Sequence, residues 1–227
     1  DAVGLVPLQS PDLAVREVAH IAQLGLKGVA FRPERYNGLA LHDEVLAPFW
    51  NGLSEQGLFA AVHGSFGSHM PSFANSRYKN TFFTHMICHP FEQMAACLDI
   101  IGGGVLERHP DLRVAFLESG LGWLEYWLHR MDEHFEVMGH QVPWLTRSPT
   151  ELFREQCFIS IEADEAHRMP KIQAMGLENC VFWGADYPHY DCTYPGAVTQ
   201  LEENLAPIDP ALADLVRYAN AARFMGL

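Results

Sequence analysis

Short apolar runs alternate along this chain with longer amphipathic stretches, and this alternation constrains the fold more than any other feature of the sequence. Each apolar run is rich in Val, Ile, Leu or Phe, which is typical of strands that are buried on both faces. Amphipathic stretches between such runs predict strand-helix-strand units and hence a parallel sheet. The six runs that we interpret as strands are residues 2–8, 28–33, 58–64, 113–119, 157–162 and 180–188.

The stretches between these runs carry the start and stop signals of helices. Residues 11–24 and 43–56 each end directly before a glycine, which can adopt the left-handed conformation that closes a helix. Residues 80–108 have a helical pattern that glycines at 102–104 interrupt, so one kinked helix or two helices fit equally well. The other predicted helices span residues 122–137, 149–155, 166–175, 196–205 and 210–224, and the predicted long loops span residues 65–79 and 139–148.

The length of the chain fits one α/β domain. Its 227 residues are 48% hydrophobic and 19% charged, which provides enough apolar surface for one large core. We therefore interpret residues 1–227 as a single domain. The chain opens with Asp1 and enters an apolar run almost at once, so we expect the domain to be incomplete at its N-terminus.

The charge and the cysteine content limit which partners the protein can bind and in which compartment it is expected. Lys and Arg total 15 against 28 Asp and Glu, and the resulting net charge of −13 offers no basic stripe to a phosphate backbone. No apolar run reaches the ~18–20 residues that span a bilayer. The five cysteines show no CxxC spacing, and no segment has the pattern of a signal peptide. We expect a cytoplasmic protein that binds neither nucleic acid nor membranes.

Polar residues stand where the predicted strands end. In parallel α/β folds the ligand site lies at the C-terminal ends of the strands, so these residues are the candidates for binding and catalysis. They are Gln9, Arg32, His63, Glu118, Glu162 and Asp186, with His189 close behind. Several of these side chains are able to ligate a metal ion or to move a proton.

Asp186 and His63 are the strongest candidates. The strand that ends at Asp186 is apolar and a proline turn follows it, so its carboxylate needs a partner. Asp186 either caps the next helix or accepts hydrogen bonds from backbone N–H groups, or it acts as a metal ligand or proton shuttle. His63 ends the run 58–64, where a histidine is either packed and hydrogen-bonded or a ligand. A carboxylate on another strand end favours the ligand role.

Two further histidines, His85 and His89, lie four positions apart and share one face if their segment is helical. The segment lacks the glutamate of an HExxH zinc site, which favours structural packing over metal binding. The sequence contains no GxSxG elbow, no GxxxxGKS/T loop and no GxGxxG motif after a strand. Serine-hydrolase and nucleotide-binding functions therefore lose support.

Several segments together resemble a known family, and the resemblance extends over nearly the whole chain. The family is the amidohydrolase-2, or decarboxylase-like, branch of the amidohydrolase superfamily. The segments that carry the resemblance are residues 24–29, Val62-His63-Gly64, residues 104–114, Gly184-Ala185-Asp186-Tyr187-Pro188-His189 and the closing Asn220-Ala221-Ala222-Arg223-Phe224.

The resemblance implies a fold and roles for three strand-end residues. The fold is a TIM-type (β/α)8 barrel, of which this chain covers about strands three to eight, with roughly a hundred residues missing upstream. His63 on strand five is then a metal ligand, and Asp186 on strand eight is a metal ligand and proton shuttle. The strand-six position commonly holds a catalytic histidine but is Glu118 here, to which we assign a catalytic role. The family's further ligands, on strand one, have no counterpart in this sequence.

The resemblance also implies one divalent metal ion, zinc or manganese, and a small organic substrate that carries a carboxylate. The reaction is then either metal-dependent hydrolysis or non-oxidative decarboxylation. Arg32, His89 and His189 are the predicted substrate-binding residues, although Arg32 could equally form a structural ion pair. A homo-oligomer is compatible with the sequence. The alternative from another class is a non-catalytic barrel homologue or assembly subunit that has lost its metal site.

Overall fold

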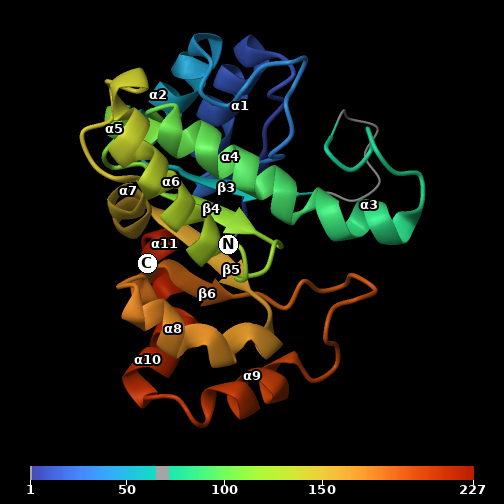
Figure 1. Ribbon diagram of the computed structural model, residues 1–227. Coiled ribbons are helices and arrows are strands. Elements are labelled where there is room, and N and C mark those ends of the chain that lie inside the picture. The colour runs from blue at the N-terminus through green and yellow to red at the C-terminus, as the bar shows by residue number, and fades with distance from the viewer. Residues whose placement is uncertain (1, 65–71) are drawn as a thin grey trace.

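The computed structural model describes residues 2–64 and 72–227, which form a parallel sheet of six strands flanked by helices (Figure 1). The strands follow one another in the sheet in chain order, and every neighbouring pair is parallel. They are β1 (Gly4–Leu5), β2 (Gly28–Phe31), β3 (Phe59–His63), β4 (Val114–Leu117), β5 (Cys157–Ile161) and β6 (Val181–Trp183). All six predicted strands are confirmed, each shorter than the apolar run that predicted it.

Helices join the strands, as the amphipathic stretches predict. The α-helices are α1 (Pro11–Gln23), α2 (Ala47–Gln56), α3 (Thr81–Cys88), α4 (Pro90–Gly102), α5 (Val105–Arg108), α6 (Leu124–Met138), α7 (Pro149–Gln156), α8 (Met169–Ala174), α9 (Ala197–Leu205), α10 (Pro210–Asp214) and α11 (Asn220–Met225). Short 3₁₀ turns are η1 (Glu44–Leu46), η2 (Gly139–Gln141), η3 (Ala163–Arg168) and η4 (Glu178–Cys180), and η5 (Leu215–Ala219) is a π-helical turn.

The stretch 80–108 forms three helices, so the prediction of one or two was wrong. Pro90 begins α4 almost directly after α3, because proline fits the first turn of a helix but not its interior. Gly104 adopts a φ of 74°, a left-handed conformation that separates α4 from α5.

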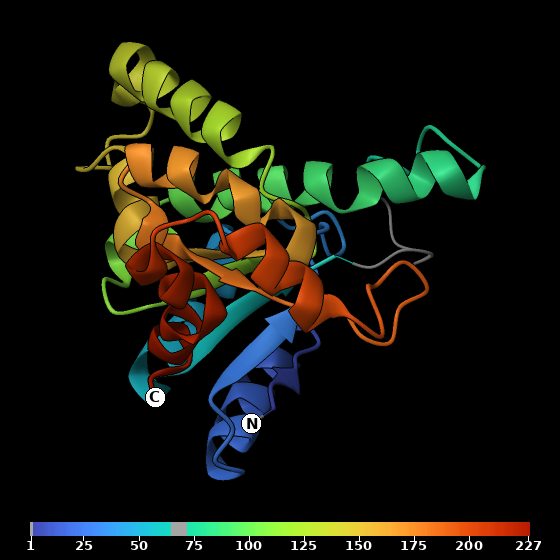
Figure 2. The ribbon, with the colours of Figure 1, turned by 90° about the horizontal axis from the view of Figure 1, so that it is seen from below.

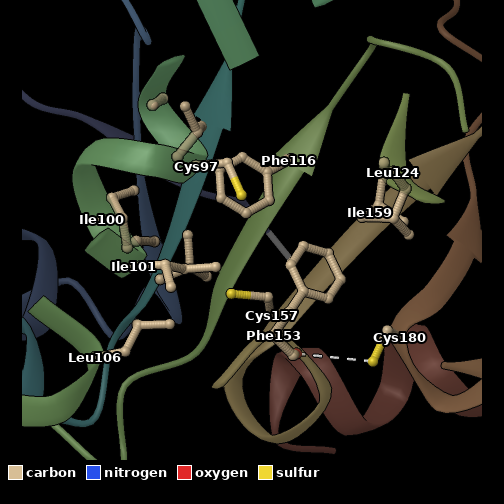
Figure 3. Close-up of a cluster of buried hydrophobic side chains, with 14 of the residues drawn as sticks. Cys97, Ile100, Ile101, Leu106, Phe116, Leu124, Phe153, Cys157, Ile159 and Cys180 are labelled. Carbon is tan, nitrogen blue, oxygen red and sulfur yellow. Dashed lines mark hydrogen bonds between the residues drawn. The ribbon is translucent and has the colours of Figure 1, made fainter. Parts of the chain in front are cut away.

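The strand order shows how the sheet is wound. A doubly wound sheet reverses its strand order and carries helices on both faces, whereas the described strands never reverse. One-way winding places the connecting helices on one face, as in the predicted TIM-type barrel. Figure 3 shows the resulting outer core, in which Phe116 of β4 and Ile159 of β5 lie among buried side chains of α4, α5, α6 and α7.

A second, smaller cluster covers the other face of the sheet. There Phe59 and Phe158 pack against Phe224 of α11. The ring centroid of Phe224 lies 4.3 Å from that of Phe59 and 5.0 Å from that of Phe158. Position 28 must be glycine, because a Cβ atom on Gly28 would lie 2.2 Å from the Phe59 ring. The last helix therefore fills the inner face of the sheet.

The C-terminal ends of the strands face the side from which α3 and the segment between β6 and α9 project (Figure 2). Of the predicted loops, residues 65–71 lie outside the described residues, and residues 72–79 contain turns but no helix or strand. The loop 139–148 begins with η2 and is anchored by Glu107, whose carboxylate accepts a hydrogen bond from the backbone N–H of Thr146 at 2.8 Å. Among the described residues, no helix combines the length and apolar character that a membrane crossing requires.

Replacing Phe224 by alanine is expected to lower the free energy of unfolding by about 3–5 kcal/mol, because it empties the centre of the inner cluster. Denaturant unfolding of the full-length protein measures this loss. Tyr218→Ala is the control, because Tyr218 is 60% exposed, whereas Phe224 is 5% exposed. Similar losses for the two variants would contradict the packing of α11 against the inner face.

Candidate metal and catalytic site

His63 is the last residue of β3, and its side chain lines a cavity at the strand ends. Its Nδ1 atom lies 2.6 Å from the backbone oxygen of Gly64. A carbonyl oxygen only accepts hydrogen bonds, so Nδ1 carries the proton. In the neutral imidazole the lone pair is then on Nε2, which is the arrangement of a metal-ligating histidine.

Glu118 and Asp186 share an unusual backbone conformation just beyond their strands. Their φ angles are 54° and 53°, in the left-handed region that residues other than glycine rarely adopt. Such conformations cost about 1–3 kcal/mol each and cluster at functional sites. The turn at Glu118 is held from the neighbouring strand, because its backbone N–H donates to Ser160 Oγ of β5 at 3.1 Å. These two turns bring both carboxylates close to His63.

Three potential ligand groups converge at this edge of the sheet. His63 Nε2 lies 3.2 Å from Glu118 Oε2. One ligand atom from each of His63, Glu118 and Asp186 lies within 4.8 Å of the others. These residues line a cavity of about 210 Å³ together with Ser160 and Glu162. They are far apart in the sequence, and parallel pairing of their strands brings them to one edge.

The approach of His63 to Glu118 requires a cation or a proton between the two atoms. In the neutral imidazole, Nε2 of His63 carries a lone pair, and Oε2 of Glu118 is buried and accepts no hydrogen bond from the described residues. Two acceptors 3.2 Å apart repel each other unless positive charge lies between them. Ligand atoms lie about 2.0–2.2 Å from a zinc ion, so two ligands of one ion lie about 3.0–3.5 Å apart. One imidazole and two carboxylates therefore fit a divalent ion.

Burial also changes the proton affinity of Glu118. Its side chain is 15% exposed. Burial raises the pKa of Glu118, His63 opposes this change and the negative charge of Asp186 adds to it, so that the pKa lies above the ordinary value. A carboxyl group with a raised pKa can hold and release a proton closer to neutral pH.

Both predicted substrate-binding histidines lie beside these carboxylates. His189 Nδ1 is 2.7 Å from Asp186 Oδ2, and this hydrogen bond raises the pKa of His189. His89 is 6% exposed, and its Nε2 lies 3.6 Å from Glu118 Oε1. Burial lowers the pKa of His89 to about 4, so its ring is neutral at physiological pH.

Arg32 lines a different cavity from His63, Glu118 and Asp186. Its Nη2 lies 2.5 Å from Oε1 of Glu34, which is 1% exposed, so the structural ion pair is the arrangement observed. Arg32 and Gln9 border a different and larger cavity, of about 1600 Å³, beside β1 and β2. The strand ends thus bring together His63, Glu118, Asp186, His89 and His189, whereas the Arg32 side chain forms an ion pair with Glu34.

Two residues of the site were missed from the sequence. Ser160, which holds the backbone of Glu118, is a polar residue inside the otherwise apolar strand β5, and that break in the pattern was a usable signal. Asp191 lies close enough to Asp186 and His189 for their ligand atoms to be within 4.8 Å of one another. It also lies 3.6 Å from His85 Nε2 of α3, a contact that no spacing in the sequence indicates.

The comparison with family models gives one clear result. The model described as Amidohydrolase matches residues 1–227, and the chain therefore belongs to the amidohydrolase family. This finding confirms the resemblance inferred from the sequence motifs. A curated relative is the 2-amino-3-carboxymuconate-6-semialdehyde decarboxylase of Dictyostelium discoideum, which is 25% identical over 99% of this chain and 60% of its own length.

Solved structures share the fold. An amidohydrolase of Mycobacterium avium subsp. paratuberculosis matches with a TM-score of 0.85 and 21% identity over 99% of this chain and 58% of its own. The 5-carboxyvanillate decarboxylase of Sphingomonas paucimobilis matches with a TM-score of 0.82 and 24% identity over 99% of this chain and 66% of its own. The α/β barrel class is confirmed by these matches. The chain spans 58–66% of the length of these relatives.

The His63→Ala variant of the full-length protein is expected to lose its bound metal, because the substitution removes the imidazole nitrogen that lies beside the Glu118 carboxylate. Metal content after dialysis against a weak chelator, measured by elemental analysis, checks this. His129→Ala is the matched control, since the His129 side chain is 73% exposed on α6. Stoichiometric metal in His63→Ala would rule out the ligand role.

Proposed function

We propose that this site is the catalytic centre of a metal-dependent non-oxidative decarboxylase that acts on a small, carboxylate-bearing organic substrate. The observation that carries the proposal is the approach of His63 Nε2 to the carboxylates of Glu118 and Asp186. Two of the relatives are named as decarboxylases, which favours loss of carbon dioxide over hydrolysis. Hydrolysis is the second candidate, because the same carboxylates could take a proton from water.

His63 and Asp186 are the proposed ligands of one divalent ion. Imidazole suits zinc and carboxylate suits manganese, so this mixed donor set accommodates either metal. When bound, the ion would polarise a substrate oxygen or lower the pKa of a water molecule. The buried Oε2 of Glu118 adds negative charge beside these two ligands and so favours cation binding.

Asp186 and Glu118 are the proposed proton-transfer groups. When the bond to the departing carboxylate breaks, the carbon atom that keeps the electron pair must receive a proton. Asp186 is hydrogen-bonded to His189, which gives it a partner for exchanging that proton. The raised pKa of Glu118 lets its carboxyl hold a proton nearer to neutral pH than an ordinary glutamate does.

Arg32, His89 and His189 remain the proposed substrate-binding residues, with unequal support. The His189 side chain is 51% exposed beside Asp186, so an entering substrate can reach it. His89 is buried next to Glu118 and would act only on a group that enters deeply. Arg32 would have to share its guanidinium between the substrate and Glu34.

The wider organisation of the protein is part of the proposal. Residues 1–227 are one barrel-type domain that corresponds to about strands three to eight of a TIM-type barrel. The chain order of the six parallel strands supports this assignment. All five cysteines are free, which fits the reducing cytoplasm. A homo-oligomeric state is compatible with the proposal.

The non-catalytic scaffold is the competing hypothesis. A barrel without a metal site would have no need for left-handed turns at both Glu118 and Asp186. It would also have no need to bury beside His63 a carboxylate oxygen that accepts no hydrogen bond from the described residues. Both features are costly for folding alone, and they favour the enzyme.

An assay of the full-length protein tests the proposed reaction. The protein, loaded with manganese or zinc, is incubated with hydroxylated aromatic carboxylates and, in parallel, with lactones. Release of carbon dioxide from at least one carboxylate is the expected result. If the protein turns over lactones but no carboxylate, the proposed reaction is hydrolysis and not decarboxylation. A protein that turns over neither class and binds no metal would support the scaffold.

The Glu118→Gln variant is expected to keep its metal but to lose about 10²–10⁴-fold in kcat, because the amide preserves the shape of the side chain and cannot exchange a proton. Glu133→Gln, at a side chain that is 62% exposed on α6, is the control. Turnover equal to that of the unmodified protein would remove Glu118 from the proton path. Loss of the metal in Glu118→Gln would instead indicate that Glu118 is a metal ligand.

A further inference from the structure

Gln93, in the first turn of α4, bridges the ends of the two strands that carry His63 and Glu118. The residue is completely buried, with 0% of its surface exposed. Its Nε2 donates one hydrogen bond to the backbone oxygen of Val62 at 2.8 Å and another to that of Leu117 at 3.0 Å. Val62 and Leu117 directly precede His63 and Glu118, so one amide group holds both strands where the site begins.

The rigidity of the peptide unit carries this restraint to the site residues. A carbonyl group and the Cα atom of the next residue lie in one plane, so a fixed Val62 carbonyl fixes the start of His63. In the same way, the Leu117 carbonyl fixes the Cα atom of Glu118, whose side chain leaves from a left-handed turn. The distance between His63 and Glu118 therefore depends on two carbonyl groups that share one donor.

Gln93 lies in a closely packed region between the start of α4 and the end of β3. α4 begins against the end of β3, because a Cβ atom on Gly64 would lie 2.6 Å from Nδ1 of His89, the residue before α4. Oε1 of Gln93 is buried and accepts no hydrogen bond from the described residues. An unsatisfied buried oxygen lowers stability, and the two hydrogen bonds that Nε2 donates offset that cost.

We infer that Gln93 is a positioning residue, which holds His63 and Glu118 at the separation that cation binding and proton transfer need. The inference rests on the proposed function, because it assigns these two residues to that site. Gln93 acts through the backbone and does not itself line the cavity at the strand ends. Its loss should weaken metal binding and turnover more than it weakens the fold.

The chain contains a matched control in Gln156, the last residue of α7. Gln156 is 3% exposed, and its Nε2 donates to the backbone oxygens of His109 at 2.8 Å and Leu112 at 3.1 Å. Its Oε1 is also buried without a hydrogen-bond partner among the described residues. The two carbonyl groups precede β4, at the opposite end of the sheet from His63. The same substitution therefore removes the same interactions, but away from the site.

The experiment compares Gln93→Met with Gln156→Met in the full-length protein. Both variants are expected to melt at lower temperature than the unmodified protein. Gln93→Met should also bind manganese about 10–100-fold more weakly in a chelator competition, as supporting residues of metal sites do. Its kcat should fall while KM changes little, and Gln156→Met should match the unmodified protein in both measurements.

Equal manganese affinities for the two variants would overturn the inference. The proposed function has a separate test, because manganese affinity is measured without any substrate. If the unmodified protein shows no decarboxylase activity, the proposed function fails. A loss of manganese affinity in Gln93→Met but not in Gln156→Met would still support the positioning role. If the methionine variants do not fold, Gln93→Glu and Gln156→Glu keep the side-chain length while removing at least one donor, and the same comparison decides.

Discussion

The parallel register of β3 and β4 is the constraint on which the candidate site depends. His63 is paired with Leu117, so Glu118 lies one residue beyond its partner on the adjacent strand. Adjacent strands lie about 4.8 Å apart, and side chains that leave the same edge can therefore touch. Left-handed turns then bring Glu118 and Asp186 toward His63, and the strain in these turns is sustained by the packed sheet below.

This convergence gathers negative charge at one edge of the sheet. The pKa values of Glu118 and Glu162 are both raised, in each case first by burial. A buried carboxyl group with a raised pKa binds a proton readily unless a cation is present to stabilise its charge. Proton uptake and cation binding therefore arise from the same physical feature, which suits a reaction that needs both. The neutral ring of His89 adds no positive charge.

The sequence predicts the strands and the main site residues well, because buried strands leave apolar runs and a charged residue at the end of such a run stands out. His63, Glu118 and Asp186 were found in this way, and the structure brings them together. The number of helices between 80 and 108 was not predicted, since glycine and proline mark a break without fixing its geometry. Gln93 was not found, because a glutamine in an amphipathic helix usually lies on the exposed face.

Anomalous X-ray scattering from crystals of the full-length protein grown with manganese tests the central claim most directly. The account predicts a single strong manganese peak within coordination distance, about 2.0–2.3 Å, of His63 Nε2 and a carboxylate oxygen of Asp186. The peak should lie beside Oε2 of Glu118. A peak elsewhere, or density at this position that is explained by a water molecule alone, would contradict it.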